Sequence, residues 1–117
     1  MSARPPAEPH DVLACLMTFP DEEVAARIAS TLVGEGLCAC VNLTAGVRSI
    51  YRWKGAVSDD REVLGIAKTT RPRFEALRRR VVELHPYEVA EVIALEVTAG
   101  HAPYLDWVRG SVADPPG

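Results

Sequence analysis

Residues 12–19 form an almost continuously apolar run that ends at Pro20. A run of this length suits a central β-strand that is buried on both faces of a sheet. Asp21 is a suitable N-cap for a following helix, with Glu22 and Glu23 in the first turn, where acidic side chains complement the helix dipole. The sequence therefore predicts a buried strand that leads directly into an amphipathic helix, which ends at a pair of glycines near residue 35.

The rest of the chain alternates between extended and helical patterns. Further extended segments are expected at residues 37–43, 47–54, 62–69 and 89–98, and further helices from Pro72 and from Pro103. Ala45-Gly46 marks a bulge or bend between the first two of these segments. A turn begins at Lys54-Gly55, and we expect residues 58–61 to form a polar hairpin tip.

This order of elements, β-α-β-β-α-β with a short terminal helix, predicts an α+β fold of the split β-α-β, or ferredoxin-like, class. Its antiparallel sheet carries two helices on one face. The other face would expose apolar side chains to water, and oligomerisation is the simplest way to cover it.

Composition limits what such a chain can do. The chain has 117 residues, and its 13 basic and 16 acidic side chains give a net charge of −3, which does not favour binding to nucleic acid. We expect one domain over residues 12–112, between a disordered N-terminal tail at 1–11 and a frayed C-terminal tail at 113–117. No apolar run is long enough to span a bilayer, and the N-terminus lacks a signal-peptide core. Three cysteines are an odd number that fits a reducing cytosol, so we expect a soluble, cytoplasmic protein.

His85 is the histidine with the most distinctive setting. It precedes Pro86, which prevents the second long helix from continuing and holds His85 extended at the helix exit. One interpretation is a C-terminal histidine that interacts favourably with the helix dipole, and the other is a ligand for a metal ion.

Two cysteines lie two residues apart in a predicted strand. Cys38 and Cys40 are therefore expected to point to one face, where thiolates are suited to a soft metal. Buried free cysteine is also an ordinary core residue, and there is no Cys-x-x-Cys pair to complete a structural zinc site.

Strand periodicity groups two further pairs. Glu62 and Lys68 have the same parity in one strand and are expected to share a face, as solvated strand ends or as part of a site at a subunit boundary. Tyr51 and Trp53 also share a face, either as packing at a sheet surface or as a stacking platform for a ligand. No nucleophile, phosphate-loop or metalloprotease motif is present, so we expect no enzymatic activity.

Six short motifs in register resemble the CutA family of divalent-cation tolerance proteins. They are Leu-Cys-Ala-Cys-Val-Asn at 37–42, Ser-Ile-Tyr-x-Trp-x-Gly at 49–55, Glu62, Lys68-Thr69, His-Pro-Tyr at 85–87 and Tyr-Leu-x-Trp at 104–107. The resemblance covers residues 12–109 and implies a ferredoxin-like subunit in a homotrimer similar to the PII signalling proteins. The chain departs from the family pattern at Ala90 and Ala45, where prolines are usual, and at Met17, where some members have cysteine.

The resemblance also implies two sets of site residues. Cys40, Glu62 and His85 are the implied metal ligands, because thiolate, carboxylate and imidazole suit copper or another divalent cation. Tyr51, Trp53, Lys68 and Tyr87 are the implied candidates for a ligand cleft.

The leading hypothesis is a CutA-like homotrimer that responds to metal ions by binding divalent cations, with no organic cofactor. One alternative is a PII-like sensor that binds a small anionic metabolite in clefts between subunits. Another is a non-catalytic trimeric scaffold for an unidentified protein partner.

Overall fold

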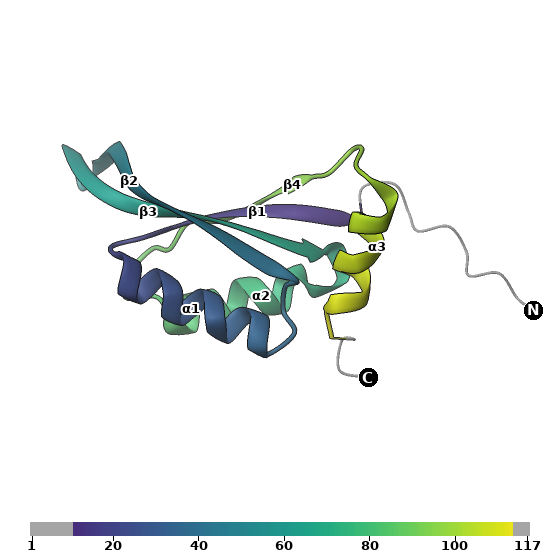
Figure 1. Ribbon diagram of the computed structural model, residues 1–117. Coiled ribbons are helices and arrows are strands. Elements are labelled where there is room, and N and C mark those ends of the chain that lie inside the picture. Colours follow the sequence, from purple (N-terminus) through teal and green to yellow (C-terminus); the bar gives the residue numbers. More distant parts are fainter. Residues whose placement is uncertain (1–10, 114–117) are drawn as a thin grey trace, which may run out of the picture.

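The structure is a computed structural model that describes residues 11–113. Four strands form one antiparallel sheet, and two helices, α1 and α2, cover one of its faces (Figure 1). The elements in chain order are β1 Val12–Phe19, α1 Glu22–Gly34, β2 Cys40–Trp53, β3 Ala56–Thr70, α2 Arg71–Leu84, β4 Val92–Glu96 and α3 Ala102–Ser111. The strand order β2-β3-β1-β4 confirms the split β-α-β, ferredoxin-like class.

The predicted start of α1 is confirmed in atomic detail. The side chain of Asp21 accepts a 2.8 Å hydrogen bond from the backbone N–H of Val24, which satisfies one of the amide groups left free at a helix N-terminus. The other long helix, α2, begins after Thr70 and ends at Leu84, and its C-cap residue His85 is extended, as the following Pro86 requires.

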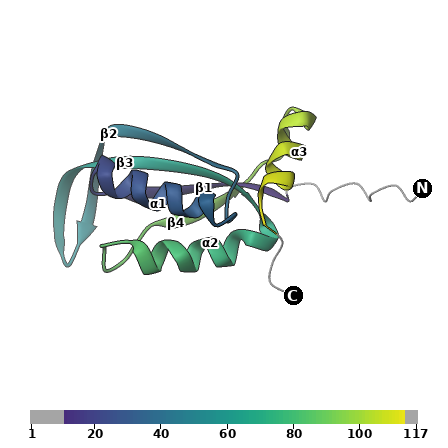
Figure 2. The ribbon, with the colours of Figure 1, turned by 60° about the horizontal axis from the view of Figure 1, so that its bottom comes forward.

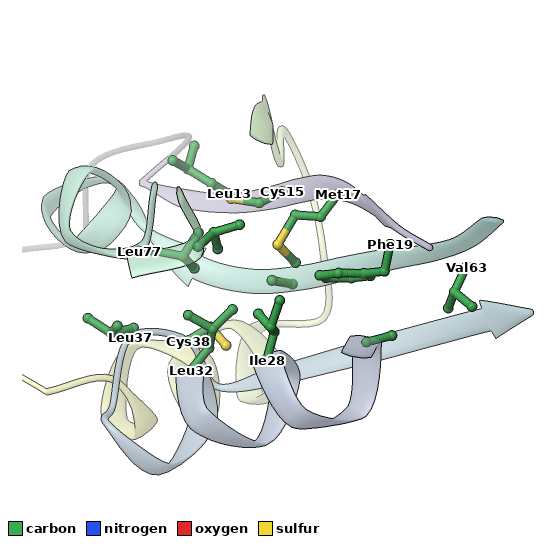
Figure 3. Close-up of a cluster of buried hydrophobic side chains, with 13 residues drawn as sticks. Leu13, Cys15, Met17, Phe19, Ile28, Leu32, Leu37, Cys38, Val63 and Leu77 are labelled. Atoms are coloured by element: carbon green, nitrogen blue, oxygen red, sulfur yellow. The ribbon is translucent and has the colours of Figure 1, made fainter. Parts of the chain in front are cut away.

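The main core lies between the sheet and the two long helices (Figure 3). Alternate residues of β1 point into it, while α1 contributes residues one turn apart. The cluster comprises Leu13, Cys15, Met17, Phe19, Ala25, Ile28, Leu32, Leu37, Cys38, Val63, Ala67, Leu77 and Val81. A smaller cluster of Val12, Ala39 and Val108 attaches α3 to the start of β1, at the end of the sheet opposite the tip of the β2–β3 hairpin (Figure 1).

The sheet face opposite the long helices, called the open face below, is only partly covered. Strand parity places Leu16, Leu64, Ile66, Ile93 and Leu95 on it. Ile93 and Leu95 keep 50% and 52% of their surface exposed. The expected uncovered apolar face is therefore present in the single chain.

The predicted bulge at Ala45-Gly46 lies inside one continuous strand. The register moves from Thr44 opposite Leu64 to Val47 opposite Glu62, so two β2 residues face a single residue of β3. Gly46 has a φ of 74°, a left-handed conformation that glycine adopts without a steric penalty. Past the bulge, the odd-numbered residues of β2 lie on the open face, whereas before it the even-numbered ones do.

The prediction of a polar hairpin tip at residues 58–61 is wrong. The strands are joined by Lys54-Gly55 alone, both with positive φ, as in a two-residue type I′ turn, and residues 58–61 belong to β3. The hairpin extends past α1 and α2, so both of its faces meet water (Figures 1 and 2). Polar residues there pair across the strands, as Arg48 does with Asp59 at 2.6 Å.

Two other strand boundaries differ from expectation. β2 begins at Cys40 rather than at residue 37, because residues 37–39 form a bend that turns Cys38 into the core. Cys38 and Cys40 therefore do not share a face. β4 is confined to five residues rather than ten, because it pairs only with residues 13–17 of β1.

The two expected tails fall largely outside the described residues. Asp11 and Ala113 are the two tail residues that the structure describes, and both form hydrogen bonds with the folded domain. Asp11 accepts hydrogen bonds from the Arg109 guanidinium at 3.0–3.1 Å, and the backbone N–H of Ala113 donates to the carbonyl of Gly36 at 2.8 Å.

Candidate functional site

A cavity of about 690 Å³ lies at the end of the sheet, between the β2–β3 hairpin and the segment that links α2 to β4. The open face of the sheet contributes Thr18, Ser49, Tyr51, Trp53 and Glu62. The linking segment contributes Pro86, Tyr87, Glu88, Val89 and Glu91. Four of the residues predicted from the sequence (Tyr51, Trp53, Glu62 and Tyr87) therefore line one cavity.

Glu62 and Tyr87 are directly joined inside this cavity. The Tyr87 hydroxyl donates a 2.7 Å hydrogen bond to Oε2 of Glu62, and Glu62 is only 8% exposed. Burial, together with the adjacent carboxylate, raises the pKa of Tyr87 above its usual value of 10.0. The phenol therefore remains a neutral donor to the carboxylate at physiological pH.

His85 lies behind the cavity wall with both ring nitrogens engaged. Nε2 lies 2.7 Å from the carbonyl oxygen of Thr18, and Nδ1 accepts a 3.1 Å hydrogen bond from the backbone N–H of Tyr87. A carbonyl can only accept, so these partners assign the proton to Nε2 of a neutral imidazole. The ring stacks on Phe19 at 5.5 Å between centroids and approaches the Tyr87 ring at 4.6 Å. His85 therefore orders the segment that carries Tyr87.

The hairpin supplies the two other aromatic side chains. The Tyr51 hydroxyl donates to the carboxylate of Asp60, and this hydrogen bond raises the pKa of Tyr51. Trp53 lies beside the ammonium group of Lys54, whose Nζ is 5.6 Å from the ring centroid. The same Nζ is 3.7 Å from Oε2 of Glu88, so the hairpin turn contacts the opposite wall of the cavity.

The remaining two predicted residues lie at a different place. Cys40 and Lys68 are directly opposite each other in the β2–β3 register. Lys68 donates a hydrogen bond to Oδ1 of Asn42, and the Cys40 thiol lies 3.6 Å from the hydroxyl of Tyr104 on α3. The predicted side chains thus form two groups, one in the cavity and one under α3.

This separation also divides the three predicted metal ligands. Glu62 and Lys68 share a face, as strand parity predicted, but six residues of extended chain separate them, which is about 20 Å. Cys40, opposite Lys68, is therefore far from Glu62 and His85 in one chain. No group of three or more His, Cys, Asp or Glu side chains suited to a metal ion occurs within residues 11–113.

Sequence reasoning missed several residues of these two groups, among them Asn42, Tyr104, Glu88 and Glu91. Asn42 has the parity of Cys40 on the same strand, so period two could have found it. Tyr104 belongs to a motif of the resemblance, but its proximity to Cys40 depends on how α3 docks on the sheet. Glu88 and Glu91 lie in an irregular segment, where no periodicity indicates which side chains face the cavity.

Comparison with known proteins places the chain in a family. Residues 13–111 match the model of the family described as CutA1 divalent ion tolerance protein. A Thermus thermophilus protein named divalent-cation tolerance protein CutA is 52% identical over 94 residues, which are 80% of this chain and 91% of that protein. The human protein CutA is 50% identical over 101 residues, or 86% of this chain, but this match spans only 56% of the human protein.

Solved structures agree with these sequence matches. The Thermus thermophilus divalent cation tolerance protein superimposes with a TM-score of 0.85 at 48% identity, over 87% of this chain and 99% of that one. CutA1 from Oryza sativa gives a TM-score of 0.86 at 38% identity, over 89% and 95% of the two chains. No helix among residues 11–113 is long and apolar enough to cross a membrane. The matches in sequence and in fold together show that the chain belongs to the CutA1 divalent ion tolerance family.

Proposed function

We propose that the protein contributes to divalent-cation tolerance by binding a divalent cation, with copper as the first candidate, and that it does so as a homotrimer. The observation that carries the proposal is the setting of Glu62. This carboxylate is 8% exposed, and its one hydrogen-bond partner within residues 11–113 is the neutral phenol of Tyr87. A buried carboxylate without a basic partner is stabilised by a cation that binds next to it.

His85 is the nearest candidate for a second ligand, because Tyr87 bonds to both Glu62 and His85. For His85 to bind a metal through Nδ1, the Tyr87 N–H must give up its hydrogen bond, so binding would displace the segment that carries Tyr87. The third predicted ligand, Cys40, can join the other two only if another subunit supplies it.

Metal titration under reducing conditions tests this site. We expect saturable binding of copper or zinc by the wild type, and loss of that binding in Glu62→Gln and in His85→Gln. His101→Gln is a matched control, because His101 is exposed at the start of α3. Cys40→Ser shows whether a thiolate from another subunit takes part. Absence of saturable binding by the wild type would contradict the cation role.

The trimer is supported by the apolar side chains on the open face. Half-exposed Ile93 and Leu95 lie beside Leu16 and Ala14 of β1, so a second subunit could cover a continuous apolar surface. Native mass spectrometry measures the assembly directly. Leu95→Glu is expected to yield monomers, whereas Val82→Glu, at a residue of α2 that is similarly exposed at 51%, keeps the trimer. A monomeric wild type, or a trimeric Leu95→Glu protein, would contradict the proposal.

A sensor for a small metabolite is a second candidate, and the cavity favours it. Its volume lies within the range of about 300–1,000 Å³ that is typical of small-molecule sites. The expected anionic ligand, however, lacks a partner there. Lys68 is not among the described residues that line the cavity, whereas three glutamates are.

We also propose a cytoplasmic location and a role without catalysis. The three cysteines are all free thiols, which fits a reducing compartment. The names of the family and of its Thermus thermophilus member refer to tolerance of divalent cations and to no reaction. Cell fractionation tests the location, and pulldown tests whether a protein partner uses the trimer as a scaffold.

A further inference from the structure

The charged side chains that line the cavity all carry the same sign of charge. The lining contains three aromatic residues (Tyr51, Trp53 and Tyr87) and three carboxylates (Glu62, Glu88 and Glu91). None of the described lining residues is Lys, Arg or His. Aromatic faces and carboxylates both attract positive charge, and together they recognise organic ammonium groups. We propose that this cavity binds an organic cation of the linear diamine or polyamine class.

The protein's own Lys54 shows that an alkylammonium group fits at the mouth of the cavity. Its Nζ lies 5.6 Å from the ring centroid of Trp53 and 3.7 Å from Oε2 of Glu88. Lys54 and Glu88 are about 70% exposed, so solvent screens this internal contact and a ligand can displace it. The arrangement is thus a weak intramolecular version of the contact that the ligand would make.

Two carboxylates at different depths explain why a ligand with two charges fits better than one with a single charge. Glu62 is buried in the inner wall and has no basic partner among the described residues, whereas Glu88 is exposed at the rim. Aromatic side chains line the same cavity and can pack against a methylene chain. A linear diamine offers this pattern, with one ammonium group at each end of an apolar chain.

The same features argue against a bare metal ion as the natural content of the whole cavity. The volume of about 690 Å³ is far larger than a single ion requires, and no three ligating side chains converge within residues 11–113. The inference rests on the cavity alone and not on the proposed metal role, so the two can be tested separately.

Calorimetry on the assembled protein in the presence of EDTA tests the inference. The probe is cadaverine, a five-carbon diamine, and its controls are the neutral diol pentanediol and the anionic diacid glutarate. In a Trp107→Phe protein, Trp53 is the remaining tryptophan and its fluorescence reports binding at the site. We expect saturable binding of cadaverine that weakens with added salt, and no binding of the two controls.

Four single substitutions make the test specific. Lys54→Gln removes the internal competitor and is expected to tighten cadaverine binding about two- to fivefold, the equivalent of one exposed cation–π contact. Glu88→Gln and Glu62→Gln are expected to weaken binding about tenfold or more, because each removes a charge-assisted contact. Glu75→Gln makes the same change in net charge on α2, outside the cavity, and is expected to bind like the wild type.

The outcomes are distinct. Tighter binding in Lys54→Gln with weaker binding in Glu88→Gln supports the proposal, even if Glu62→Gln does not fold. No saturable binding of cadaverine, equal binding of pentanediol, or weaker binding in Lys54→Gln overturns it. Copper or zinc binding in a separate titration without EDTA would remain unaffected by that failure.

Discussion

The Tyr87 phenol and the Glu62 carboxylate meet in a 2.7 Å hydrogen bond that links the α2–β4 segment to the sheet. Because the acceptor is charged and buried, Tyr87→Phe is expected to lower the free energy of unfolding by about 1.5–3 kcal/mol. In a Glu62→Gln background the same change should cost less, since a neutral amide replaces the carboxylate. Urea unfolding of the four proteins at one protein concentration measures both costs. Equal costs in the two backgrounds would refute a direct coupling.

Gly65 lies where β3 passes beneath Phe19. A Cβ at this position would come 2.8 Å from Cε2 of Phe19, whose ring stacks on His85. Gly65→Ala is therefore expected to destabilise the fold by about 1–3 kcal/mol through overpacking. Gly34→Ala is the control, because a Cβ there meets nothing within 4 Å, and the change is expected to be neutral or to stabilise α1. Thermal unfolding compares them, and equal melting temperatures would argue against the steric explanation.

The three cysteines differ in their expected reactivity. Burial raises the pKa of Cys15 from 9.0 to about 11 and that of Cys38 from 9.0 to about 12, so both remain unreactive thiols near neutral pH. Cys40 is partly exposed. Iodoacetamide should therefore modify one cysteine per chain in the native protein and all three after unfolding. Peptide mapping identifies the site, and Cys40→Ser should abolish the native reaction. Rapid labelling of Cys15 or Cys38 in the folded protein would contradict this order.

The same two thiols predict how stability depends on pH. Because their folded-state pKa values are raised, their contribution is complete below pH 9.0 and is lost as the pH rises through about 11 and 12. The free energy of unfolding should fall in this alkaline window, by up to about 1.4 kcal/mol per pH unit for each thiol. Tyr87, whose pKa is also raised, acts in the same direction.

Chemical denaturation between pH 8 and pH 11 measures this slope. The Cys15→Ala/Cys38→Ala protein lacks both buried thiols. We expect it to be less stable than the wild type at pH 8, and its free energy of unfolding should fall less steeply as the pH rises. An equally steep decline in that protein would show that other groups cause it.

The sequence was most informative where the structure is locally regular. The apolar run of β1, the Asp21 cap of α1 and the shared face of Glu62 and Lys68 all follow from period and capping rules that depend on near neighbours. Cys38 shows the limit of such rules, because parity holds only inside a strand and β2 begins two residues later. The polar residues at 58–61 resemble a turn, but they lie in a ribbon that is exposed on both faces.

The sequence indicated several residues of the candidate site, but not how far apart they lie in the fold. Tyr51, Trp53, Glu62 and Tyr87 do line one cavity. The distance that separates Cys40 from Glu62 depends on strand register, which periodicity leaves undetermined. The sign of charge in the cavity depends on Glu88 and Glu91, and an irregular segment places them there.

The single extra residue at Ala45-Gly46 decides which side chains of the outer hairpin reach the cavity. If β2 kept all its residues and continued without the bulge, its even-numbered residues would stay on the open face, and Ile50 and Arg52 would take the orientation that Tyr51 and Trp53 now hold. Deleting one of the two residues would instead restore regular pairing with Val47 still opposite Glu62, so both aromatic side chains would stay on the open face. Loss of one codon at this point would thus remove the bulge without exchanging the side chains that the outer hairpin presents.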